Sequence, residues 1–326
     1  MSNNNYPVPQ KSILRLGVMC LFTVIALHNI RASHPHRQLT SKDLIQAPSF
    51  NDQKTVEDMT SKSQLALPNI LFLGAQKAGS SSVSSWLFQG GVCRPKTFPG
   101  EPKYYAKEVH FFDIDERHNQ GVEFYAQRFQ HCVDEGNDLI MDATPDYLTY
   151  SEKISEVYNN AGADALSKLK VIVILREPIS RELSWYNHKY FYAHGTGPTF
   201  ERHSELVLKG IPDIHMTSLG RYVDHLKKFA SLVSRDNILV LSYDELKKDP
   251  EKVQWRIQQY LGREFPGALA TLNTHDDPNK LREVSASARQ MLEPYFRGKN
   301  EELFEFLDAH PGPPMEQRPF PRFDVE

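Results

Sequence analysis

The fold is decided by residues 69–88, which read NILFLGAQKAGSSSVSSWLF. The apolar run from Asn69 to Gly74 is short and ends in glycine, as a buried parallel strand does. Apolar residues then recur at helical spacing from Ser81 to Phe88, which predicts a helix. Strand, tight loop and helix in this order place the loop at the carboxyl end of a parallel strand, where α/β proteins bind their ligands.

The loop carries groups that suit a phosphate. Gly74 and Gly79 allow tight turns, and free N–H groups at a helix start attract an anion. The loop is not a Walker motif, because its lysine precedes the second glycine; this disfavours an ATP or GTP hydrolase. A plain strand-to-helix turn with an exposed lysine is the alternative. We expect the ligand to be bound by Lys77, Ala78, Gly79, Ser80, Ser81 and Ser82.

Further apolar runs predict the rest of the fold. Buried strands are expected at Leu139–Met141, Lys170–Leu175 and Ile238–Ser242. Strands that alternate with helices predict an α/β fold, P-loop-like and three-layered, with a central parallel sheet flanked by helices. The helices are expected after residue 176 to about Tyr192, and at 251–261, 287–296 and 301–307.

A second anion site is predicted in residues 176–186, REPISRELSWY. Arg176 leaves the carboxyl end of its strand, so it faces the same crevice as Lys77. Ser184 follows about two turns along the next helix. A guanidinium fork and a hydroxyl together suit one phosphate. The alternative is a surface pair between Arg176 and Glu177, with Ser184 as a neutral helix residue.

Charge and the N-terminal sequence indicate the compartment. The net charge of −3 gives no reason to expect nucleic acid as a partner. Residues 13–30, ILRLGVMCLFTVIALHNI, predict a signal-anchor transmembrane helix, in preference to a cleaved signal or a transit peptide. We expect 1–12 to be a cytoplasmic tail and 31–66 a polar stem. The chain would then be a single-pass type II protein of the Golgi membrane, whose short span suits a thin bilayer.

Three cysteines are too few for a disulfide framework. Cys20 lies in the apolar stretch. Cys93 and Cys132 could pair in an oxidising compartment or remain two apolar thiols, and spacing leaves both possibilities open.

The motifs together resemble the sulfotransferases that use 3′-phosphoadenosine 5′-phosphosulfate (PAPS). The nearest resemblance is to the heparan sulfate glucosaminyl 3-O-sulfotransferases and N-sulfotransferases. Residues 107–113, KEVHFFD, are similar to the E-V-H-F-F-D segment of those enzymes. Residues 143–147, ATPDY, fall where they carry a K-T-P-x-Y-like segment, and 238–250, ILVLSYDELKKDP, resemble a later strand and turn. The resemblance implies a sulfotransferase domain over 67–310, followed by a proline-rich tail over 311–326.

The resemblance implies a reaction and roles for single residues. PAPS would donate a sulfuryl group to a hydroxyl or amine of a carbohydrate, without a metal. Lys77 would stabilise the leaving phosphate, and Arg176 and Ser184 would bind the 3′-phosphate. Glu108 would be the general base, with His110 beside it in the acceptor cleft; on an extended segment the two would share a face. The alternative is an ordinary strand, because the residues alternate and Val109 and Phe111 would point inward. Further candidates are Lys280, or else Arg282, for the donor. Asp113, Tyr147 and Tyr192 are candidates for the acceptor, with core packing as the alternative for the tyrosines.

Departures from the family pattern define the rival hypotheses. Ala143 replaces the family's lysine before T-P, and Ser81 stands where the 3-O-enzymes often carry arginine. These changes bear on a heparan-type acceptor more than on the reaction class. One rival is a nucleotide or sugar kinase with magnesium at Asp142. The other is a catalytically inactive carbohydrate-binding relative, which would bind the donor without turnover.

Overall fold

The computed structural model describes residues 65–162, 164–192, 197–210, 219–270 and 280–323. They belong to one compact unit, Ser61–Glu326. The expected anchor at 13–30 and the stem up to residue 64 lie outside the described residues. Within the described ranges, no helix combines the length and the apolar character that a membrane span requires.

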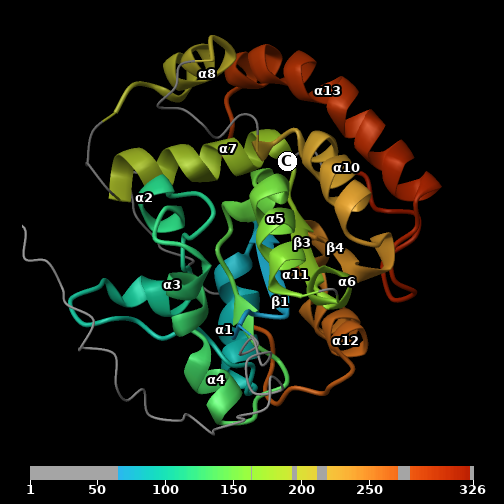
Figure 1. Cartoon of the computed structure of the whole chain (residues 1–326). Helices are drawn as coiled ribbons and strands as arrows, with labels where there is room; N and C mark the ends of the chain where they lie inside the picture. The colour runs from blue at the N-terminus through green and yellow to red at the C-terminus, as the bar shows by residue number, and fades with distance from the viewer. Residues whose placement is uncertain (1–64, 163, 193–196, 211–218, 271–279, 324–326) are drawn as a thin grey trace, which may run out of the picture. The chain divides into compact units, whose positions relative to one another are not determined.

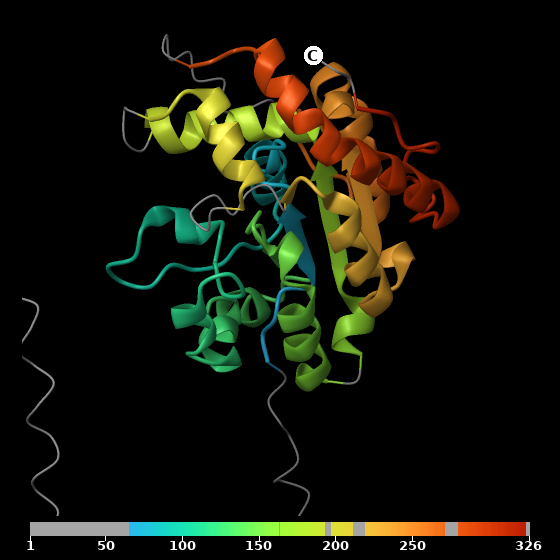
Figure 2. The ribbon, with the colours of Figure 1, turned by 90° about the horizontal axis from the view of Figure 1, so that it is seen from above.

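A parallel sheet of four strands lies in the middle of the unit, with helices around it (Figures 1 and 2). Its order is β2-β1-β3-β4, and the pairs keep a parallel register such as Ile70 with Lys170 and Val171 with Ile238. Nearly every strand residue is buried, because helices cover the sheet; this explains the continuous apolar runs. The expected α/β class is confirmed. The strands are β1 (Ile70–Gly74), β2 (Met141–Asp142), β3 (Lys170–Leu175) and β4 (Ile238–Ser242).

The helices follow the strands as the alternating pattern predicts. Two helices were expected at 287–296 and 301–307, but one continuous helix runs from 286 to 309 with Pro294 inside it. Buried residues such as Leu292 and Leu303 hold both halves of this helix on the core. The helices are α1 (Ser80–Gln89), η2 (Lys103–Ala106), α2 (Asp115–His118), α3 (Val122–Gln127), α4 (Gln130–Asp134), η3 (Tyr147–Thr149), α5 (Ser151–Ala161), α6 (Ala165–Lys168), α7 (Pro178–Asn187), η4 (His188–Tyr192), α8 (Phe200–Leu208), α10 (Tyr222–Leu232), η5 (Arg235–Asn237), α11 (Tyr243–Lys248), α12 (Pro250–Leu261) and α13 (Ala286–Ala309).

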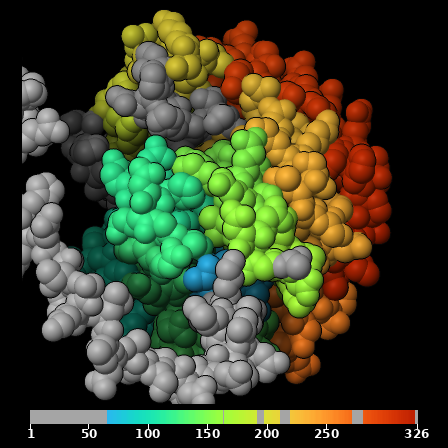
Figure 3. Space-filling view, in the orientation of Figure 1, coloured from blue at the N-terminus to red at the C-terminus, as the bar shows by residue number. Residues whose placement is uncertain are grey.

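Two apolar cores stabilise these elements. The larger surrounds the sheet. The smaller joins α7, α8 and α13 through residues such as Leu183, Phe200 and Phe296. α13 also packs along α10, and the space-filling view shows the red C-terminal region beside the orange one (Figure 3). Cys93 and Cys132 form a disulfide with a Cα separation of 5.9 Å, which decides the question that their spacing left open.

The tail over 311–323 contains neither helix nor strand, yet it packs on the domain. The carboxylate of Glu316 is buried, accepts the N–H of Val240 at 2.8 Å and pairs with Arg235. β4 is an edge strand of the sheet, so this contact caps backbone that would otherwise be open to another strand.

Removing the cation of this pair is expected to destabilise the protein. Arg235→Met leaves a carboxylate that is only 2% exposed without its partner, which costs about 3–5 kcal/mol. Lys168→Met is the control, since its pair with Asp164 is open to water and contributes about 0–1 kcal/mol. Urea unfolding of both variants measures the difference. Equal loss in the two would contradict a structural role for the tail contact.

Candidate active site

The loop between β1 and α1 turns through left-handed backbone. Lys77 has φ 69° and Gly79 has φ 87°. A Cβ at Gly79 would lie 2.7 Å from the Cδ2 atom of Leu246, so the turn needs glycine for space as well as for φ. No side chain caps the start of α1. Its first N–H groups can therefore serve a bound anion.

Basic side chains from distant parts of the chain meet at this loop. Burial, and then the charges of Arg176 and Lys280, lower the pKa of Lys77 to about 8; Lys107 adds to this, and the carboxylate of Glu108 opposes it. Cations held this close repel one another unless an anion lies between them. The arrangement suits an anion, and it places the charges of Arg176 and Lys280 near Lys77, three of the residues expected from the sequence to hold the donor.

Arg176 is held against the phosphate loop. Its Nη1 donates to the carbonyl oxygen of Lys77 at 3.1 Å, and its guanidinium lies over the ring of Tyr243. Its Nε is buried and has no hydrogen-bond partner among the described residues. The rival surface pair is wrong, because the Glu177 carboxylate instead caps α7 and accepts from the N–H groups of Ile179 and Ser180.

The remaining donor candidates vary in accessibility. Ser81 is half-buried and accepts a hydrogen bond from Lys107 Nζ at 3.4 Å, whereas Ala78, Ser80 and Ser82 are buried. Ser184 lies half-buried on α7, the helix that begins two residues after Arg176. Tyr192 ends η4, and its side chain lies outside the described residues.

The segment over 107–113 is not the extended strand that the alternating pattern predicted. His110 has φ 54°, and the stretch forms turns. The turned form is fixed from behind by Asp142, which is buried beneath it. Its carboxylate accepts the N–H of Val109 at 3.3 Å and the hydroxyl of Thr144 at 2.7 Å.

The turn nevertheless brings Glu108 and His110 together. His110 Nε2 lies 3.4 Å from Glu108 Oε2, and His110 Nδ1 lies 2.6 Å from Asp113 Oδ2. The Lys107 ammonium contacts the other oxygen of Glu108. The result is a chain of alternating charges, from Lys107 through Glu108 and His110 to Asp113.

These contacts set the protonation states. Burial alone would raise the pKa of Glu108, but the hydrogen bond from His110 and the charge of Lys107 outweigh it, so the pKa lies below its ordinary value. Burial alone would lower the pKa of His110, but bonds to Asp113 and Glu108 raise it to about 10. At neutral pH Glu108 is therefore ionised and His110 is a cation. The carboxylate can accept a proton, and the imidazolium positions it.

Tyr147 does not lie where the acceptor candidate was expected. It is fully buried, its hydroxyl donates to Asp142 at 3.0 Å, and it accepts the N–H of Phe111 at 2.7 Å. Tyr147 therefore supports the turned segment from inside the core. Asp142 also accepts from Val109, Thr144 and Tyr125 and is fully buried, so the magnesium ligand of the kinase hypothesis has no oxygen that faces solvent.

Two groups of potential metal ligands occur among the described residues. One consists of His131 and the two cysteines of the disulfide, whose sulfurs are not free as thiolates. The other is His110, Asp113 and Asp146, with ligand atoms within 4.8 Å of one another. Burial, and then the charge of Asp113, raise the pKa of Asp146 to about 6. An ion there would have to displace the proton of His110, which opposes its binding.

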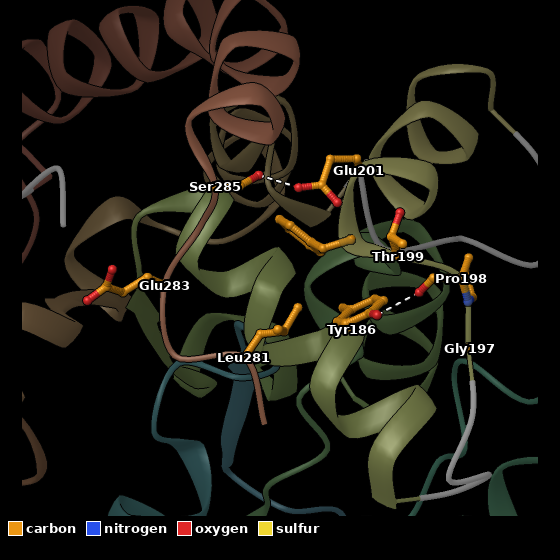
Figure 4. Close-up of a pocket in the computed structure, with 9 residues that line it drawn as sticks. Tyr186, Gly197, Pro198, Thr199, Glu201, Leu281, Glu283 and Ser285 are labelled. Atoms are coloured by element: carbon orange, nitrogen blue, oxygen red, sulfur yellow. Dashed lines mark hydrogen bonds between the residues drawn. The ribbon is translucent and has the colours of Figure 1, made fainter. Parts of the chain in front are cut away.

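A separate pocket of about 400 Å³ lies between α7, the start of α8 and the segment after Lys280 (Figure 4). Glu201 and Glu283 line it, and Glu201 accepts from the Ser285 hydroxyl at 2.5 Å. The Tyr186 hydroxyl on its wall donates to Pro198. Two carboxylates make this pocket unsuited to a phosphate or a sulfate.

The fold and the site first define a class: a parallel α/β protein with basic side chains at the carboxyl ends of β1 and β3 and a carboxylate–histidine pair beside them. The chain belongs to the sulfotransferase domain family, whose model matches residues 67–294. The match confirms the family predicted from the sequence and places the chain in a class of transferases.

Individual relatives agree with the family. Bifunctional heparan sulfate N-deacetylase/N-sulfotransferase 2 of Homo sapiens is 23% identical over 286 residues, which are 78% of this chain and 31% of that protein. N-deacetylase/N-sulfotransferase 1 of Caenorhabditis briggsae is 26% identical over 277 residues, 75% of this chain and 30% of that protein. The chain thus spans about a third of the length of these relatives. A sulfotransferase from Alicyclobacillus acidocaldarius shares the fold, with a TM-score of 0.59, 23% identity and coverage of 74% of this chain and 96% of that one.

Two features of the site were missed in the sequence. Lys107 stood beside the expected base but received no role, because only the structure shows its ammonium between Glu108 and Ser81. Tyr104, whose carbonyl oxygen accepts the N–H of Glu108 at 3.0 Å, belongs to a short helical turn without an apolar pattern.

Proposed function

We propose that the protein transfers a sulfuryl group from PAPS to a hydroxyl or amine of a carbohydrate. The observation that carries this proposal is the meeting of Lys77, Arg176 and Lys280 at one loop, next to the ionised Glu108. A donor with phosphates at its 3′ and 5′ positions needs more than one basic group, which the β1 and β3 loops supply. The names of the relatives, which include heparan sulfate N-sulfotransferases, support a carbohydrate as the acceptor.

The geometry suggests how the residues divide the work. The acceptor oxygen or nitrogen attacks sulfur in line, the bond from sulfur to the 5′-phosphate oxygen breaks, and 3′-phosphoadenosine 5′-phosphate leaves. Glu108 takes the acceptor proton, and His110 fixes its carboxylate. Lys77 stabilises the charge that develops on the leaving phosphate. Arg176 and Ser184 hold the 3′-phosphate, with the N–H groups that begin α1 on the 5′-phosphate.

The position of Lys107 argues against the hypothesis of a catalytically inactive relative. That hypothesis depended on Ala143, which replaces the family's lysine. The N–H of Ala143 donates to the carbonyl oxygen of Lys107 at 3.1 Å, and the Lys107 ammonium contacts Glu108 and Ser81. A basic group therefore stands beside the base although position 143 carries none. This favours turnover over binding alone.

We further propose that the domain works in the Golgi lumen, attached through the segment 13–30. The disulfide between Cys93 and Cys132 supports an oxidising compartment, because cytosolic thiols are kept reduced.

Titration with the bisphosphate product tests the donor site. We expect 3′-phosphoadenosine 5′-phosphate to bind more tightly than ATP, because ATP has no 3′-phosphate for Arg176. Arg176→Ala should weaken the bisphosphate at least about tenfold, the effect of losing one charge-assisted contact, and leave ATP nearly unchanged. Arg297→Ala, on an exposed part of α13, is the matched control. Calorimetry that shows equal affinity for both nucleotides would favour the kinase instead.

A further inference from the structure

An exposed aromatic ring lies close to the candidate base. Tyr104 in η2 is 53% exposed, the most of any large apolar or aromatic side chain among the described residues. Its ring centroid lies 6.2 Å from that of His110 and 4.5 Å from that of Tyr105. Its carbonyl oxygen accepts the N–H of Glu108, so the ring and the base are fixed to the same piece of backbone.

A chain of charged groups contacts the neighbouring ring of Tyr105. The guanidinium of Arg117 lies 4.0 Å from the ring centroid of Tyr105, and Arg117 Nη1 lies 3.4 Å from Glu101. The same Glu101 carboxylate pairs with Arg128, which is fully buried, at 2.6 Å. Breaking a buried ion pair is strongly destabilising, so Glu101 and Arg128 hold each other in place. Here the network fixes the segment that carries Tyr104 and Tyr105.

We propose that Tyr104 is the stacking platform of an acceptor subsite, on which a pyranose ring of an oligosaccharide lies while a neighbouring hydroxyl or amine reaches Glu108. The inference rests on the proposed function and adds the recognition element that the nucleotide site lacks. The C–H face of a pyranose is apolar and is rimmed by hydroxyls, which suits a wet aromatic ring with a polar tip. Single exposed aromatic residues are common on protein surfaces; the buried support and the link to Glu108 distinguish this one.

Neighbouring residues agree with this occupant. Lys107 lies three residues after Tyr104, and its ammonium contacts Glu108. It can therefore also face an anionic or hydroxyl-rich sugar bound beside the base. Tyr105 is turned toward Arg117 and serves as the backing layer. Tyr105 lies between the Tyr104 ring and the charged network. Loss of the exposed Tyr104 ring therefore removes contact area without disturbing the buried pair of Glu101 and Arg128.

Direct binding tests the platform independently of turnover. The probe is an unsulfated hexasaccharide of alternating glucuronic acid and glucosamine, with and without N-acetyl groups, titrated into the full chain by saturation-transfer NMR with the bisphosphate nucleotide present. Tyr104→Ala is expected to weaken the hexasaccharide about tenfold, the usual cost of losing an exposed aromatic anchor. Tyr104→Phe should keep most of the affinity, because the ring carries the contact. Val133→Ala, an exposed apolar residue on α4, is the control.

The outcomes separate this inference from the proposed function. Unchanged nucleotide affinity with weaker saccharide in Tyr104→Ala supports the platform. Unchanged saccharide affinity in Tyr104→Ala overturns it. So does a loss of saccharide affinity in Tyr104→Phe that is as large as the loss in Tyr104→Ala. If the wild-type chain binds the nucleotide but neither form of the saccharide, the platform is wrong while the donor site stands. If it binds the saccharide through Tyr104 but no nucleotide, the proposed transfer fails and the platform remains.

Discussion

Replacing Glu108 by glutamine is expected to lower the turnover number about 10²–10⁴-fold, the range that a general base contributes. The amide keeps the shape of the side chain but cannot take the proton that the acceptor loses. Affinity for 3′-phosphoadenosine 5′-phosphate should change little, because Glu108 is expected to act on the acceptor. A radiolabelled sulfate transfer assay and a nucleotide titration on the same preparation separate the two effects.

Glu116→Gln is the matched control for this variant, since the same chemical change is made at an exposed carboxylate on α2. Its turnover should equal that of the wild type. A Glu108→Gln variant with wild-type turnover would remove Glu108 from the mechanism. The cluster of His110, Asp113 and Asp146 would then be the next source of a base, because burial raises the pKa of Asp146 to about 6.

The fold could be predicted from the sequence because its strands are buried on both faces. Runs such as Val171–Leu175 are apolar throughout, and glycine or a charged residue ends them. The same strand ends placed Lys77 and Arg176 at one crevice, which the structure bears out. The helix over 286–309 was divided wrongly, because its polar middle hides the fact that buried residues on both sides hold one continuous helix.

The acceptor side was harder to predict, because tertiary contacts override its alternating pattern. The pattern predicts Val109 and Phe111 as the inward residues of a strand. In the structure the N–H of Val109 donates to Asp142 and the N–H of Phe111 donates to the Tyr147 hydroxyl, and these bonds hold the segment in a turn. No local rule gives His110 its left-handed φ. Tyr147 looked like a residue for stacking on a sugar, and only the structure shows that its hydroxyl is used inside the core.

Lys77→Ala is expected to have a comparable effect by a different route. Its ammonium would stabilise charge on the leaving phosphate, and loss of one such group costs about 10²–10³ in turnover. Unlike Glu108→Gln, this variant should also weaken the bisphosphate nucleotide, because the same cation holds the product. Lys228→Ala, at an exposed lysine of α10, is the control for loss of a positive charge.

The pH dependence of nucleotide binding identifies Lys77 more specifically than the loss of affinity in Lys77→Ala does. Burial and its basic neighbours lower the pKa of Lys77 to about 8, so its ammonium is present below that pH and is lost above it in the free protein. The phosphates of the nucleotide are already ionised there, since their second pKa lies near 6. His110 remains a cation, because its pKa is raised to about 10.

Affinity of the wild-type protein for 3′-phosphoadenosine 5′-phosphate should therefore fall as the pH rises from 7.5 to 9, about tenfold for each pH unit at the steepest. The bound anion raises the pKa of Lys77, so the slope should flatten again at higher pH. The Lys77→Ala profile should be nearly level over the same range. An equal fall in both proteins would assign the titration to another group and leave Lys77 without its proposed place at the leaving phosphate.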